Sequence, residues 1–299
     1  MTDISDIKPK KKRANKILLS LLKLLLTAGM LWLVFTQADL QKIKSYAAKA
    51  EFLWLAIAFV VLNIGQIISS FRMRYYLASA GLKISRKLAI SLYYAGMLFN
   101  LILPGGVSGD GYITWFIHKK MGFYWKTILL RLISGRGSGL LLLTVFALLL
   151  GFFSPSLAEI PYRWLLLSFA LAGIFPAYSF LASFLLKEPV KIQIGAAKYS
   201  ALVQGMSLLA AFFLLISIGH SGMEIDYLLL FLLSNIISIL PISVGGVGLR
   251  ELTFFYGSAL FGLDAELGIT ISVLYFLVNT FASLFGVMFF YRLKMEGSK

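Results

Sequence analysis

The chain has 299 residues, of which 59% are hydrophobic, and its mean hydropathy is +0.86. This apolar content exceeds the ~45–50% typical of soluble domains, so we expect an integral membrane protein. The formal net charge of +15 would suggest nucleic-acid binding in a soluble protein, but here the basic residues gather at the ends of apolar segments, so no nucleic-acid partner is predicted. The absence of cysteine excludes disulfides, thiolate metal sites and cysteine nucleophiles.

The chain begins with a basic stretch, residues 1–16, which we interpret as a cytoplasmic tail in front of a retained first helix. We expect a single all-α transmembrane domain over residues 17–291 and a second cytoplasmic tail over 292–299. About six apolar segments are long enough to cross a bilayer. In chain order these are 17–36, 52–71, 128–153, 165–186, 199–219 and 269–291.

Two further apolar segments are broken by proline and glycine. The first reads Leu-Pro-Gly-Gly-Val-Ser-Gly-Asp over 103–110, and the second reads Leu-Pro-Ile-Ser-Val-Gly-Gly-Val-Gly-Leu-Arg-Glu over 240–251. Proline removes a backbone donor and glycine permits tight turns, so each break frees backbone groups that need partners. We predict two re-entrant helical hairpins, at about 88–117 and 227–261. The alternative is that Pro and Gly only allow kinked helices to pack closely.

The distribution of charge orients this arrangement. With the N-terminus in the cytoplasm and both hairpins returning to the side they started from, the basic residues fall mostly inside. Only Lys42, Lys44, Lys49 and Arg163 fall in outer loops. The hairpins then enter from opposite faces, as in transporters with inverted repeats. If the hairpins crossed fully, the cluster of Lys119 and Lys120 would lie outside, against the positive-inside rule.

Four ionisable residues are predicted at membrane depth, where each costs ~2.5–3.5 kcal/mol on insertion scales. These are Asp110, Arg136, Arg250 and Glu251, and three of them follow a glycine cluster. Arginine matches phosphate in bidentate geometry, so we expect Arg136 and Arg250 to contact an anionic head group. Arg136 is alternatively the partner of Asp110. For both acids a purely structural ion pair is the alternative to a role in binding.

Several neighbouring residues have supporting roles in this prediction. Arg131 is expected to anchor its helix at the cytoplasmic interface, and Gly135 and Gly139 form a small-residue stripe typical of close packing. Asn100 and Asn235 precede the two prolines, so either can satisfy freed backbone groups, and Ser108 and Ser243 are weaker candidates.

Signals of catalysis are poor. The two histidines, His118 and His220, cannot form a HExxH zinc site or a triad, and no nucleotide-binding loop is present. We therefore assign no catalytic residue, no metal site and no cofactor. A carboxylate pair from Asp110 and Glu251 is the only arrangement that would favour an enzyme.

The two broken segments resemble the motifs of the lysylphosphatidylglycerol synthase transmembrane family, also called flippase-like proteins. The resemblance extends over nearly the whole chain and includes 136–140. It implies an all-helical membrane domain with re-entrant elements. In bifunctional relatives this region translocates an aminoacylated phospholipid made by a separate domain, so we expect any such lipid-modifying synthase to be a separate partner here.

The sequence thus predicts a multi-pass lipid flippase of the cytoplasmic membrane, with both termini cytoplasmic. A phospholipid or related amphiphile would place its head group between the hairpins, and anionic lipids would contact the cytoplasmic face. The predicted binding residues are Gly105, Gly106, Asp110, Arg136, Gly245, Gly246, Arg250 and Glu251. Two alternatives are a membrane-embedded transferase acting on lipid-linked substrates and a non-transporting partner of a lipid or envelope synthase.

Overall fold

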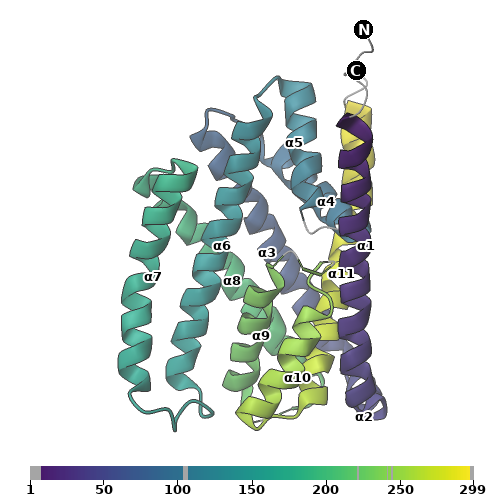
Figure 1. The fold of residues 1–299 in the computed structure, drawn as a ribbon, viewed down its shortest axis with the longest axis vertical. Helices are drawn as coiled ribbons and strands as arrows, with labels where there is room; N and C mark the ends of the chain where they lie inside the picture. Colours follow the sequence, from purple (N-terminus) through teal and green to yellow (C-terminus); the bar gives the residue numbers. More distant parts are fainter. Residues whose placement is uncertain (1–7, 104–106, 221, 241, 244, 297–299) are drawn as a thin grey trace.

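The computed structural model describes residues 8–103, 107–220, 222–240, 242–243 and 245–296, which form an all-helical bundle without strands (Figure 1). The predicted residues Gly105 and Gly106 lie outside this part of the chain. The helices are α1 (Lys8–Gln37), α2 (Leu40–Ala48), α3 (Phe52–Ser79), α4 (Arg86–Ile102), α5 (Ser108–Met121), α6 (Trp125–Phe153), α7 (Arg163–Leu186), α8 (Val190–Ser217), α9 (Glu224–Ser238), α10 (Leu249–Phe261) and α11 (Ala265–Glu296).

Five of these helices, α3, α6, α7, α8 and α11, are long and apolar enough to cross a membrane. A sixth span results if the bent pair α1 and α2 counts as one, which agrees with the expected set of about six. Most of these helices continue past the apolar segments: α1 already begins at Lys8 within the expected tail, and α3 runs on to Ser79 instead of ending near residue 71. Helical hydrogen bonding does not depend on the apolar solvent, so a helix can extend into its basic flank.

The two broken segments form two helical hairpins in opposite halves of the molecule. Figure 1 shows α4 and α5 in the upper half and α9 and α10 in the lower half, with the connection of each hairpin facing the middle. The helical limbs extend over 86–121 and 224–261, close to the predicted 88–117 and 227–261. The two hairpins therefore point toward the middle of the molecule from its opposite ends.

Each hairpin packs into a hydrophobic core of its own. The lower core joins α9 and α10 to α3, α8 and α11 through buried side chains such as Phe231 and Phe254. The upper core joins α4 and α5 to α3 and α6 through Leu92 and Ile117. The long helices α3, α6 and α11 contribute to both cores. Because each hairpin is fixed by its own core, the space between their tips is left for polar side chains.

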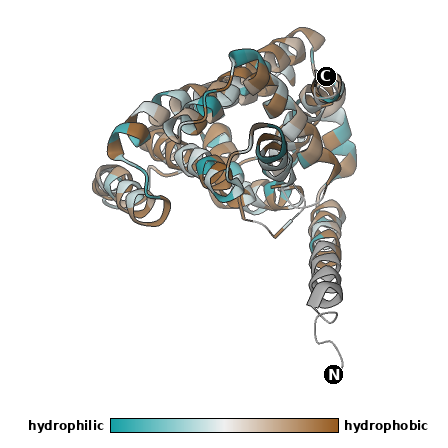
Figure 2. Ribbon diagram, turned by 90° about the horizontal axis from the view of Figure 1, so that it is seen from above, coloured by the Kyte–Doolittle hydropathy of each residue, from teal (hydrophilic) through white to brown (hydrophobic). Residues whose placement is uncertain are grey.

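The outer surface of the bundle is apolar, as lipid contact requires. Large side chains on several helices are strongly exposed, among them Phe52 at 82%, Phe169 at 81% and Leu260 at 83%. Viewed from above, hydrophobic colouring predominates around the bundle, and α1 stands at its edge (Figure 2). These surfaces support a multi-pass membrane protein.

Basic residues collect at one end of the molecule. The start of α1, the open end of the α4–α5 hairpin, the turn from α7 to α8 and the end of α11 all lie at the upper end in Figure 1. The sequence assigns its basic clusters to these segments, whereas the lower end holds Lys42, Lys44, Lys49 and Arg163. The fold therefore separates the charges between its two ends in the way the topology prediction requires.

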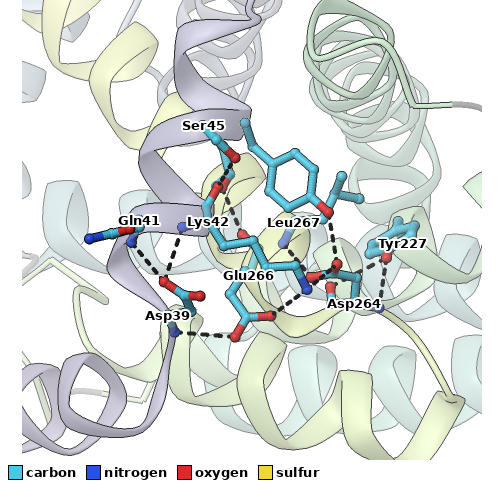
Figure 3. Close-up of polar contacts among 10 residues, drawn as sticks. Asp39, Gln41, Lys42, Ser45, Tyr227, Asp264, Glu266 and Leu267 are labelled. Carbon is cyan, nitrogen blue, oxygen red and sulfur yellow. Dashed lines mark hydrogen bonds and ion pairs between the residues drawn. The ribbon is translucent and has the colours of Figure 1, made fainter.

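Helix α2 was not predicted. It turns by 89° from α1, and Asp39 caps its first turn by accepting the N–H groups of Gln41 and Lys42. Lys42 Nζ lies 2.8 Å from Asp264 Oδ2, and Tyr46 Oη donates to the same carboxylate at 2.8 Å (Figure 3). These contacts connect α2 to the loop before α11, which follows directly on the second hairpin.

The contact between Lys42 and Asp264 should make the attachment of α2 dependent on pH. Burial opposes ionisation of Asp264, but hydrogen bonds from Lys42 and Tyr46 outweigh it and lower its pKa to about 2. The stabilisation is therefore fully present above the ordinary aspartate pKa of about 3.9 and is lost as the pH falls through about 2. Lys42→Ala should loosen α2 already at neutral pH.

A spin label on Lys44→Cys can measure this loosening, because the chain has no other cysteine. At pH 7 we expect the label to be more mobile in the Lys42→Ala protein than in the protein that retains Lys42. In strong acid the label should be equally mobile in both proteins. Lys49→Ala is the control, since the described contact of the Lys49 side chain is local: its Nζ lies 5.9 Å from the ring centre of Tyr46. Equal mobility at pH 7 with and without Lys42 would contradict the attachment.

Candidate functional site

A cavity of about 420 Å³ lies between the two hairpins, and both broken segments contribute to its wall. Val107 of the first break lines the cavity, as do Ser243, Gly245 and Gly246 of the second. The hairpin limbs supply the polar lining residues Tyr93, Asn100, Ser238 and Arg250. The long helices supply Gln66, Arg72, Arg136, Gln204, Asn279, Thr280 and Ser283. The predicted site residues Arg136, Gly245, Gly246 and Arg250 are thus brought together on one wall, although they come from α6 and from the second break.

Two smaller cavities of about 180 and 250 Å³ adjoin the first, and all three share Arg72 and Tyr93. The cavity of 180 Å³ is lined by Asp110, Arg131 and Arg136, and the cavity of 250 Å³ is lined by Asn235 and Arg250. Among the described residues that line the three cavities there are four arginines and a single carboxylate, that of Asp110. The wall is therefore electropositive and suits an anionic ligand.

The first break is held by the side chains that precede and follow it. Asn100 Oδ1 accepts the Gly109 N–H at 2.8 Å, and Ser108 Oγ lies 3.0 Å from the carbonyl oxygen of Phe99 and 3.2 Å from that of Leu103. These contacts satisfy an N–H at the start of α5 and carbonyls at the end of α4. The prediction that Asn100 satisfies freed backbone is confirmed. Asn235 does not do so, because it donates to Phe231 O within its own helix.

Asp110 and Arg136 form an ion pair, with Asp110 Oδ2 2.6 Å from Arg136 Nε. The Asp110 side chain is 14% exposed and that of Arg136 is 44% exposed. This pairing was one of the two predicted roles of Arg136. Because Arg136 also lines the 420 Å³ cavity, the pair leaves it in a position to meet a ligand.

The second break is shaped by left-handed glycines. Gly245 and Gly246 have φ values of 64° and 80°, which L-residues with a side chain rarely adopt. A Cβ on Gly246 would lie 2.8 Å from Ser238 Cβ at the end of α9, whereas one on Gly245 would meet open space. The chain therefore returns to α10 in close contact with α9 and exposes Gly245 to the cavity.

Arg250 follows these glycines in the first turn of α10 and lines two of the three cavities. Its guanidinium carbon lies 5.7 Å from the ring centre of Tyr275, and its buried Nε has no hydrogen-bond partner among the described residues. A buried guanidinium N–H without a partner costs free energy unless a ligand completes it. Arg250 is thus the arginine with the most evident unmet hydrogen bond at the large cavity.

Glu251 does not line any of these cavities. Its Oε2 accepts the Gly248 N–H at 2.7 Å, and its Oε1 accepts Ser272 Oγ at 2.8 Å. The side chain is buried, so both oxygens cap the start of α10 and attach it to α11. Glu251 therefore has a structural role as a helix cap, which is neither the predicted ligand contact nor the alternative ion pair.

The sequence prediction missed Arg72, which lines all three cavities and donates to Ser200 Oγ at 3.1 Å. In the sequence, Arg72 directly follows the expected span 52–71, a position typical of an interfacial residue. Gln66, Ser69 and Arg72 recur every three residues on α3, and this polar stripe was the signal for a cavity-facing side. Gly139 lies opposite, where a Cβ would come 3.1 Å from Arg72 Nη1. The expected close packing at Gly139 is therefore confirmed, with an arginine as the neighbour.

Arg131 also differs from its predicted role as an interfacial anchor. It lines the 180 Å³ cavity beside Asp110 and Arg136, and its buried Nε and Nη1 have no hydrogen-bond partner among the described residues. A separation of five residues places Arg131 and Arg136 on different faces of an ideal helix, but both line the same cavity.

A model of the family described as the lysylphosphatidylglycerol synthase TM region matches residues 20–286. Among the curated proteins compared, none matches the chain. The family match extends over both hairpins, the arginines of the cavities and the chain from within α1 to within α11. The chain belongs to the lysylphosphatidylglycerol synthase transmembrane family.

Proposed function

We propose that this protein moves a phospholipid or related amphiphile between the leaflets of the cytoplasmic membrane. The observation that carries the proposal is the electropositive cavity between two hairpins of opposite direction. Its volume of about 420 Å³ suits a polar head group, while the acyl tails remain in lipid at the apolar surface of the bundle. Arg72, Arg136 and Arg250 bind the phosphate, and Gly245 and Gly246 let it approach the backbone.

The neutral part of the cavity wall supports this assignment. Tyr93 Oη donates to Gln66 Oε1 at 3.2 Å, and Gln66 Nε2 donates to Asn279 Oδ1 at 3.2 Å. These amides and hydroxyls can give up their hydrogen bonds to one another and form hydrogen bonds to the hydroxyls or amines of a head group instead. The tips of the hairpins, on either side of this wall, are the elements that open toward one leaflet or the other.

In this proposal the hairpins are re-entrant and both ends of the described chain face the cytoplasm. The basic end of the fold, where α1 begins and α11 ends, supports this orientation through the positive-inside rule. The same end offers lysines and arginines to anionic lipids. No nucleotide-binding motif occurs in the sequence, so we expect transport to be downhill or coupled to an ion.

A leaflet-exchange assay in proteoliposomes tests the proposal. Head-group-labelled phosphatidylglycerol and phosphatidylethanolamine are reconstituted with the protein, and an impermeant quencher is added outside. We expect label from the inner leaflet to become accessible faster than in protein-free liposomes, most strongly for the lipid that fits the arginine wall. Equal rates in both preparations, for both lipids, would count against transport and favour a role as a non-transporting partner of a lipid synthase.

A further inference from the structure

A buried carboxylic acid, Glu188, lies outside the cavity wall described so far. It occupies the turn between α7 and α8 and is only 1% exposed. Neither of its carboxylate oxygens has a hydrogen-bond partner among the described residues. A carboxylate in this state would pay a large desolvation cost, whereas a protonated carboxyl would not.

The turn holds Glu188 firmly in this buried position. The preceding residue, Lys187, has a left-handed φ of 49° and is exposed, whereas Glu188 is buried. The Glu188 N–H donates to Ala182 O at 3.2 Å, and Gln193 Nε2 donates to Glu188 O at 2.8 Å. A left-handed lysine is strained, so the inward direction of Glu188 is maintained at a cost.

Charged and titratable groups approach Glu188 from three helices. Arg131 comes from α6, Tyr76 from α3 and Tyr178 from α7, and Tyr178 also interacts electrostatically with Arg72 of α3. The lysines next to it in sequence, Lys187 and Lys191, are exposed. The hydroxyls of Tyr76, Tyr178 and Ser134 also lack hydrogen-bond partners among the described residues, so the cluster has unused donors and acceptors.

Burial raises the pKa of Glu188 above its ordinary value, and the neighbouring Ser134, Tyr76 and Arg131 only partly oppose this rise. The carboxyl therefore accepts a proton at a higher pH than an exposed glutamate does. Its ionised form is then fully present only when the pH rises well above the usual glutamate range.

Arg131 connects this acid to the cavities. Its positive charge favours the ionised form of Glu188 without a direct ion pair between the described side chains, and it also lines the 180 Å³ cavity with Asp110 and Arg136. When Glu188 is ionised, its carboxylate competes with an anionic ligand in the cavity for the Arg131 guanidinium. When Glu188 is protonated, this competition ends and Arg131 is available to the ligand. Protonation therefore makes the cavity more favourable for an anionic group.

We propose that Glu188 is a proton-binding site whose occupancy sets the availability of Arg131 to an anionic lipid head group. The coupling to lipid rests on the proposed function, but the proton site itself does not. Because coupling between two ligands is reciprocal, a bound anionic head group must in turn favour protonation of Glu188.

Infrared titration of the purified protein in nanodiscs tests the site without any transport. We expect a protonated-carboxyl band that titrates above the usual glutamate range and disappears in Glu188→Gln. The matched control is Glu159→Gln, since Glu159 is exposed in the loop between α6 and α7 and should not contribute to that band. A band that is the same in Glu188→Gln and wild type would overturn the proton site.

A second variant covers the case in which Glu188→Gln fails to fold. Arg131→Gln removes the positive neighbour and should raise the titration midpoint by about 1 pH unit. Addition of short-chain phosphatidylglycerol should also raise the midpoint in wild type but not in Arg131→Gln. An unchanged midpoint in both measurements would overturn the link between Glu188, Arg131 and the cavity. Absence of leaflet exchange together with an intact Glu188 band would instead count against the transport function alone.

Discussion

Arg250→Ala is expected to slow lipid exchange in proteoliposomes by about tenfold or more while leaving the protein folded and inserted. The loss has a physical cause in the unpartnered Nε of Arg250, which lies at the wall of two cavities. A hydrogen bond to a charged group contributes about 1.5–3 kcal/mol, which corresponds to a rate lower by about tenfold or more. Insertion should not suffer, because an arginine at membrane depth is itself unfavourable.

Two further variants separate the charge of Arg250 from its shape. Arg250→Lys keeps the charge but loses the bidentate geometry, so exchange should fall to an intermediate rate. Arg86→Ala removes an exposed arginine at the start of α4, away from the cavities, and should exchange lipid as wild type does. Normal lipid exchange by Arg250→Ala would show that Arg250 only packs against Tyr275 and does not bind phosphate. This result would remove the main support for the phosphate site.

Gly246→Ala is expected to destabilise the second hairpin far more than Gly245→Ala. Both positions have positive φ, which costs a side chain about 1–2 kcal/mol. Only at Gly246 would the new Cβ also collide with the side chain of Ser238, at 2.8 Å, so α9 and α10 would have to separate. Together the two effects should amount to about 3 kcal/mol or more.

Thermal unfolding in detergent measures this difference directly. The melting temperature of Gly246→Ala should fall clearly below that of Gly245→Ala, which is the matched control one residue away. Gly246→Ala combined with Ser238→Gly should recover part of the loss, since the second change removes the Cβ that the first one meets. Equal melting temperatures for the two single variants would contradict the close approach of α9 and α10 at this point.

The sequence by itself determined the class of fold and the position of the breaks. Apolar length decides which helices cross a bilayer, and this one-dimensional property predicted about six spans. Proline and glycine act on the backbone locally, so the two hairpins and the role of Asn100 beside the first break followed from the chain alone. The pairing of Asp110 with Arg136 was one of two predicted outcomes, and it is the one found.

The tertiary structure decided which polar side chains share the space between the hairpins. Arg72 and Arg131 look interfacial in sequence, but the packing of α3 and α6 turns both toward the cavities. Glu251 looks like a ligand residue, yet it caps α10 because Gly248 N–H and Ser272 Oγ occupy its oxygens. Glu188 gave no sequence signal at all. Burial and pairing arise between helices far apart in the chain, so only the folded packing could assign these roles.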